Sequence, residues 1–82
     1  MLQAAQIRAA RALLGWRQQD LAKASKIGLA TIARIEQGSG MVQGNISTIS
    51  SIQRALEREG IYFIGGGNEV EPFGVELRRS RR

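Results

Sequence analysis

The side chains with chemical potential in this chain are mostly cations: lysine and arginine number 12, aspartate and glutamate 7, across 82 residues. Cysteine and histidine are absent from the sequence, which excludes disulfides, thiolate nucleophiles, zinc fingers and imidazole catalysis. Glu57 and Glu59 stand at i, i+2, so they do not share one face of a helix as an acid–base pair would need to. The glycines of 38–44 and 65–67 match no phosphate-binding motif. We therefore expect no enzymatic activity, no metal site and no cofactor.

The charges are unevenly distributed along the chain. Residues 1–44 hold six Arg or Lys against two acids, a net of +4, whereas residues 45–77 hold two Arg against five Glu, a net of −3. The last five residues, 78–82, add +4. A basic front, an acidic back and a basic tail suit a protein that turns one face to a polyanion. The alternative is that the charges only keep the chain in solution.

Short apolar stripes organise residues 17–38. Leu21 and Ala22 fit one short helix, and Ile32 and Ile35 repeat at the i, i+3 spacing of a second helix. Since only a three-residue turn separates the two stripes, the helices must cross, with the isoleucine of the turn packed between them. This arrangement is a helix-turn-helix.

The residues of this stretch resemble the lambda-repressor/Cro type of helix-turn-helix, often called the Xre family. The resemblance rests on Gln18-x-x-Leu21-Ala22, Ile27 and Ile32-x-x-Ile35-Glu36-x-Gly38. Its first helix is matched by Arg8-Ala9-Ala10-Arg11-x-Leu13-Leu14-Gly15-Trp16, and the similarity covers residues 4 to 60. Two positions depart from the family pattern: Lys26 replaces the usual turn glycine, and Gly28 replaces the usual Ser or Thr cap.

The resemblance implies that the third helix reads base edges in the major groove of double-stranded DNA. Leu29, Ala30 and Arg34, with Thr31 alongside, are the implied readers, because a guanidinium can bind guanine and apolar groups can meet thymine methyls. Gln18 would hold a phosphate or orient a neighbour. Because few of these side chains can read bases directly, DNA shape would contribute to the specificity. The full set of expected DNA contacts is Arg17, Gln18, Lys26, Gly28, Leu29, Ala30, Thr31, Arg34, Gln37, Ser39 and Asn45.

The resemblance also implies an ion pair between Arg11 and Glu36, which would tie the first helix to the third. We expect a first helix over Met1–Trp16 that Gly15 caps, with Trp16 covering the core. An Arg-rich, acid-free start is also the composition of a mitochondrial transit peptide, the less favoured alternative. After a loop over 38–44, Asn45 should cap a fourth helix, whose stripe is Ile46, Ile49, Ile52 and Leu56 and which Gly60 ends.

After Gly60 the spacing of the apolar residues changes from that of a helix to that of a strand. Residues 61–64 and 73–78 have the composition and alternation of strands, and the glycines between them signal a turn. The predicted fold is thus mostly α: a four-helix, lambda-repressor-like helix-turn-helix domain (1–60), then a C-terminal β-hairpin (61–77) and a basic tail (78–82). The tail either follows DNA phosphates or only aids solubility.

The hairpin also suggests how two copies would associate. An isolated hairpin is marginal in water and has unpaired edges, so we expect a homodimer through Ile61, Phe63, Phe73, Val75 and Leu77. The alternative is a hairpin that folds back on the fourth helix of its own chain.

The expected function is that of a cytoplasmic transcriptional regulator that binds specific DNA sequences. The same fold can instead serve as a protein-binding module, such as an antitoxin or an antiactivator. An unexplained apolar patch or a co-purifying partner would favour that alternative.

Overall fold

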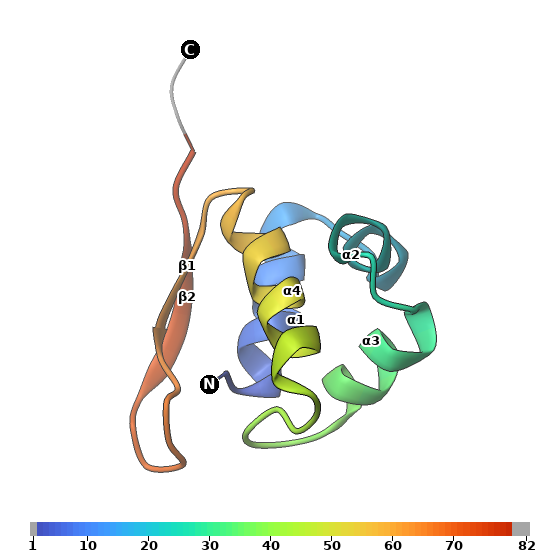
Figure 1. The fold of residues 1–82 in the computed structure, drawn as a ribbon. Helices are drawn as coiled ribbons and strands as arrows, with labels where there is room; N and C mark the ends of the chain where they lie inside the picture. The colour runs from blue at the N-terminus through green and yellow to red at the C-terminus, as the bar shows by residue number, and fades with distance from the viewer. Residues whose placement is uncertain (1, 80–82) are drawn as a thin grey trace.

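The computed structural model describes residues 2–79, which form four helices followed by a two-stranded antiparallel hairpin (Figure 1). The helices and strands are α1 (Ala4–Leu14), α2 (Gln18–Ser25), α3 (Leu29–Gln37), α4 (Ile46–Glu57), β1 (Ile61–Gly65) and β2 (Phe73–Leu77). This is the fold class that the sequence predicted. None of the described helices is both long enough and apolar enough to cross a membrane.

The ends of the helices follow local rules, with one correction at the start of α1. Gly15 ends α1 in the left-handed region, at φ 70°, and the Asn45 side chain caps α4 by accepting a hydrogen bond from the Ser47 backbone N–H at 2.8 Å. Helix α1 begins at Ala4, three residues later than predicted, and Leu2 and Gln3 precede it. Gln3 instead pairs with Met41 of the α3–α4 loop in an isolated β-bridge, and its backbone N–H bonds to the Gln6 side chain at 2.9 Å.

The core forms where the apolar stripes of the four helices meet. Its buried apolar members are Leu2, Ala4, Ile7, Ala10, Leu21, Ile32, Ile35, Val42, Ile49, Ile52, Ala55, Leu56 and Ile61. Two residues assigned to the stripes are exposed instead: Ile46 at 72% and Leu13 at 46%. Ile46 opens α4 and Leu13 is near the end of α1, and both are rotated from the centre of their stripe by most of a quarter turn. Trp16 is half-buried against the core, as predicted.

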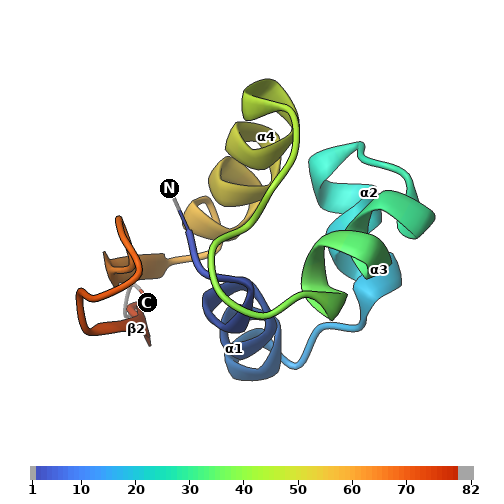
Figure 2. The ribbon, with the colours of Figure 1, turned by 90° about the horizontal axis from the view of Figure 1, so that it is seen from below.

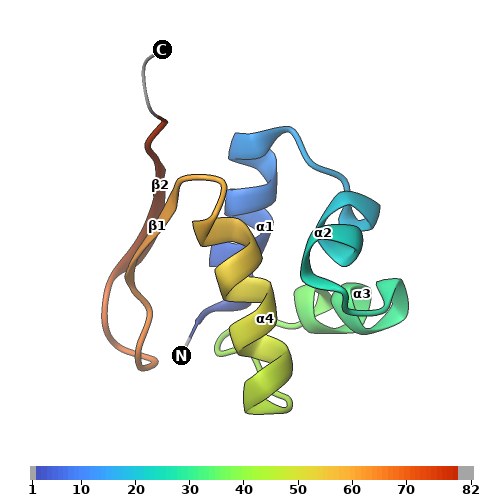
Figure 3. The same ribbon diagram turned by 45° about the horizontal axis from the view of Figure 1, so that its top comes forward.

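The hairpin packs on its own chain, mainly against α1 and also against α4 (Figures 1 and 3). The register pairs Ile61 with Leu77 and Phe63 with Val75, and these four side chains are buried or half-buried against the core. They face the core of their own chain, and the homodimer predicted through them stays a prediction. Phe73, the fifth predicted dimer residue, is exposed. The alternative prediction placed the hairpin against α4 of its own chain. The hairpin does pack on its own chain, but α1 supplies most of the packing.

Gln6 fastens the hairpin to α1. This side chain is only 1% exposed, and its Nε2 donates to the carbonyls of Ile64 and Gly74 at 3.1 and 3.0 Å. Gly66 packs against the same amide: its φ is 85°, and an added Cβ would lie 2.2 Å from the Gln6 Oε1 atom. A side chain at position 66 would thus displace the residue that holds the hairpin.

Arg78, the first residue of the predicted tail, contacts the hairpin. The Arg78 backbone N–H bonds to the Gly60 carbonyl at 2.8 Å, and the Arg78 guanidinium lies 4.0 Å from the centre of the Tyr62 ring. Arg78 therefore extends the hairpin, and residues 80–82 of the predicted tail lie outside the described residues. The division into residues 1–60 and 61–77 stays a prediction, although Ile61 belongs to the same core as the helices.

Candidate nucleic-acid interface

Helices α2 and α3 cross at a tight turn, as Figure 2 shows. Lys26 adopts the left-handed conformation, at φ 61°, that the family's glycine would supply. The turn is held by Ser25, whose hydroxyl donates to the Leu21 carbonyl at 2.7 Å and accepts from the Ile27 N–H at 3.3 Å. Ile27 is half-buried against the core. The helix-turn-helix geometry is therefore kept with a lysine in place of the glycine.

Helix α3 has one buried and one exposed face. Ile32, Ile35 and Glu36 are buried, whereas Ala30, Arg34 and Gln37 are exposed. At 100° per residue, the three exposed residues lie within a 60° arc opposite the buried row. The predicted readers Leu29 and Thr31 flank this arc, Leu29 exposed and Thr31 half-buried. The exposed face thus offers a guanidinium and a carboxamide beside small apolar groups.

A buried carboxylate fixes the angle of α3. Glu36 is 3% exposed and accepts two bonds from Arg11, Nε to Oε2 and Nη2 to Oε1, both at 2.7 Å. The Nε2 of Gln18 reaches Glu36 Oε1 at 3.4 Å, and Arg11 Nη1 also donates to the Trp16 carbonyl at 2.9 Å. The predicted ion pair is confirmed. It joins α1, the start of α2 and α3, and Gln18 orients a neighbour, one of its two expected roles.

The structure brings some of the predicted contact residues together. Arg34 and Ser39 line one groove of about 410 Å³ where α3 meets the following loop, together with Ile35, Gly38, Met41 and Gln43. Arg17 is exposed at the start of α2, and its backbone N–H bonds to Asp20 at 2.8 Å. Seen from below in Figure 2, α3, this loop and the start of α4 share one side of the molecule. That side is suited to lie against a DNA duplex.

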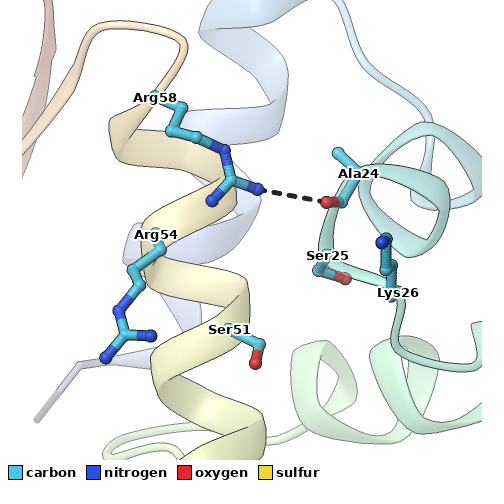
Figure 4. A pocket seen from close by; sticks show the side chains of 6 residues that line it. All are labelled: Ala24, Ser25, Lys26, Ser51, Arg54 and Arg58. Atoms are coloured by element: carbon cyan, nitrogen blue, oxygen red, sulfur yellow. Dashed lines mark hydrogen bonds between the residues drawn. The ribbon is translucent and has the colours of Figure 1, made fainter.

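Three other predicted contact residues lie outside that groove. Lys26 directly follows α2 and lines a different groove, with Arg54 of α4 and Arg58, the residue after α4 (Figure 4). Asn45 is exposed, but its carboxamide oxygen already accepts from the backbone of α4. Gly28 is exposed just before α3 and can offer only its backbone.

Sequence reasoning missed one residue that holds the interface in place. The Arg8 guanidinium donates to the backbone carbonyls of Glu36 and Gly38 at the end of α3. Those carbonyls have no partner within the helix, and a cation is favoured at the negative end of the helix dipole. The signal available in the sequence was Arg8 itself, one of two arginines beside the apolar stripe of α1.

Comparisons with known proteins agree with this geometry. A protein-family model described as helix-turn-helix matches residues 7–59. The curated proteins and the solved structures gave no significant match. The matched region spans α1 to α4 and more than half of the 82 residues. The chain therefore belongs to the lambda-repressor/Xre-like helix-turn-helix family of DNA-binding regulators.

Proposed function

We propose that this protein is a transcriptional regulator that binds specific double-stranded DNA sequences by placing α3 in the major groove. The observation that carries the proposal is the exposed arc of α3, because a buried ion pair holds the helix from behind. Arg34 would bond to guanine and Gln37 to adenine, while Leu29, Ala30 and the Thr31 methyl would meet thymine methyls.

The remaining predicted residues would hold the phosphate backbone. Arg17 and Gln18 at the start of α2 lie beside one strand, and Ser39 and Asn45, around the α3–α4 loop, lie beside the other. The Gly28 backbone at the turn is a further phosphate contact. Such contacts set the register of a protein on DNA without reading its sequence.

We also propose that the protein acts as a homodimer in the cytoplasm. The exposed arc of α3 is too short for tight specificity by itself. Two copies related by a twofold axis would read half-sites about one helical turn, roughly 34 Å, apart.

A protein-binding role is the second candidate, and the outer side of the hairpin favours it. Tyr62 and Ile64 alternate with the core-facing Ile61 and Phe63, so they lie on the outer side of the hairpin, and both are about half exposed. Apolar side chains gathered in this way are a feature of protein interaction surfaces.

Selection of bound duplexes from a random DNA pool tests the proposed function. We expect enrichment of an inverted repeat, and binding of the selected duplex should weaken with log salt at about −0.9 per phosphate contact. Failure to retain any duplex at low salt would contradict DNA binding and favour the protein-binding role.

A further inference from the structure

A basic groove lies between α2 and α4, outside the exposed arc of α3 (Figure 4). Its volume is about 400 Å³, and its lining is Ala24, Ser25, Lys26, Ser51, Arg54 and Arg58. Arg54 belongs to the half of α4 that lies farther from α3, and Arg58 directly follows that half (Figures 1 and 3). A duplex lying along α3 therefore does not explain why these cations are gathered here.

The cations of this groove have no acidic partner among residues 2–79. No carboxylate lies within 4.0 Å of Lys26, Arg54 or Arg58. Arg58 Nη2 donates to the Ala24 carbonyl at 3.3 Å, and the Ser25 and Ser51 hydroxyls donate to carbonyls within their own helices. The donors left to a ligand are therefore the three charged groups, and an anionic group is the chemistry that would balance them.

Lys26 adds a second, independent observation. Among the described residues other than glycine, it alone has a positive φ. A side chain in that conformation is strained, and glycine would avoid the strain. Because the turn itself requires this conformation, what Lys26 adds is a cation beside the groove at a position where the family pattern has glycine.

The hairpin turn carries the complementary chemistry. Glu69 and Glu71 flank Val70, whose side chain is 90% exposed. The turn is preorganised, because Asn68 Oδ1 accepts from the backbone N–H groups of Val70 and Glu71 at 3.0 and 2.9 Å. Glu71 Oε1 in turn accepts from the Gly67 N–H at 2.8 Å. A rigid turn loses little conformational entropy when it docks.

The turn cannot reach the groove of its own chain. In all three ribbon views the hairpin lies on one side of α1 and α4, and α2 lies on the other side (Figures 1, 2 and 3). The occupant that the charges favour must therefore come from another molecule.

We infer that the basic groove of one copy receives the acidic turn, residues 68–72, of a second copy. A twofold axis would form this contact twice, with each groove holding the partner's turn. Glu69 and Glu71 would face Arg54, Arg58 and Lys26, and the valine would contact the groove floor near Ala24. The inference rests on the proposed homodimer and gives it an interface in place of the inner hairpin face.

Charge reversal at two residues tests this contact. Arg54 and Glu69 are suitable because their side chains make no hydrogen bond or ion pair to another described residue. Sedimentation velocity should show a dimer for the unmodified chain, and Arg54→Glu and Glu69→Arg should each raise the dimer Kd by at least about tenfold, because like charges then meet twice. An equimolar mixture of the two variants should recover the dimer, since both contacts in the mixed pair are again between opposite charges.

A control variant separates the effect of losing the local contact from the effect of changing the net charge. Lys23→Glu makes the same charge change as Arg54→Glu at an exposed position on α2 that does not line the groove, and it should leave the dimer Kd within about threefold of the original. A monomeric unmodified chain, unchanged self-association of the two reversal variants, or a mixture that stays monomeric would each overturn the inference.

Binding to a duplex with a single half-site separates this inference from the proposed function. Arg54→Glu should lower affinity for the half-site no more than Lys23→Glu does. If Arg54→Glu weakens half-site binding further and leaves the dimer intact, the groove holds DNA phosphate and the inference is wrong. A dimer that shows charge-reversal rescue but binds no DNA would keep the inference and remove the proposed function.

Discussion

Removing Arg11 should be among the most damaging single changes in this protein. Its guanidinium donates two hydrogen bonds of 2.7 Å to the Glu36 carboxylate, which is almost fully buried. Loss of one partner of a fully buried pair costs about 3–5 kcal/mol, since the other charge is left without compensation. The Arg11 side chain is 19% exposed, so water can partly replace it. We therefore expect Arg11→Met to cost about 3 kcal/mol, toward the lower end of that range.

Such a loss is large for a domain of 82 residues. Stabilities of small domains lie near 5–15 kcal/mol, and each kcal/mol corresponds to a change in Tm of about 4–8 °C. Urea unfolding followed by circular dichroism measures the effect, with an unchanged m value as the sign that cooperativity is kept.

Two further variants show whether the cost comes from a stranded charge. Arg17→Met removes an exposed pair whose nitrogen and oxygen are 3.8 Å apart, and it should cost less than about 1 kcal/mol. The double variant Arg11→Met, Glu36→Leu should recover most of the lost stability, because apolar groups can replace a buried ion pair. A cost for Arg11→Met no greater than that for Arg17→Met would refute the reasoning, and so would a double variant less stable than Arg11→Met.

Three other changes follow from the structure. Lys26→Gly should raise stability by about 0.5–1 kcal/mol, because it relieves the positive φ, and should weaken self-association; calorimetry and sedimentation check the two effects. Gln6→Leu should speed hydrogen exchange of the hairpin backbone N–H groups while α2 and α3 keep their protection, because the hydrogen bonds from the Gln6 side chain to the Ile64 and Gly74 carbonyls are lost. Hairpin protection equal to that of the unmodified chain would contradict the role of Gln6. Arg78→Ala should raise the pKa of Glu76 toward its ordinary value, because the hydrogen bond and then the charge of Arg78 hold that pKa low; NMR titration measures the change, and an unchanged pKa would rule out this cause.

The helices and the hairpin could be predicted from the sequence because their signals are local. The turn at Ile27, the cap at Asn45 and the glycine at position 15 each act within a few residues of their own position. The buried ion pair was also foreseen, but through resemblance to a family: no periodicity links Arg11 to a residue 25 positions away.

The surroundings of the hairpin could not be predicted in the same way. Alternation along Phe73–Leu77 identifies the apolar face of a strand, but it does not say which surface covers that face. The answer depends on Gln6, a polar residue on α1 whose partners lie more than 50 residues away. For the same reason the basic groove was not foreseen, because Lys26 and Arg54 meet only when α2 and α4 pack together.

The central claim is that the exposed arc of α3 reads the sequence of double-stranded DNA, and a comparison of base preference tests it most directly. Affinities of the unmodified chain, Arg34→Ala and Arg17→Ala would be measured against the selected duplex and every single base-pair change within one half-site. We expect Arg34→Ala to lose about 1–3 kcal/mol of discrimination at one base pair of each half-site. Arg17→Ala should weaken binding to all duplexes alike. An Arg34→Ala variant that keeps the full preference of the unmodified chain would contradict the claim.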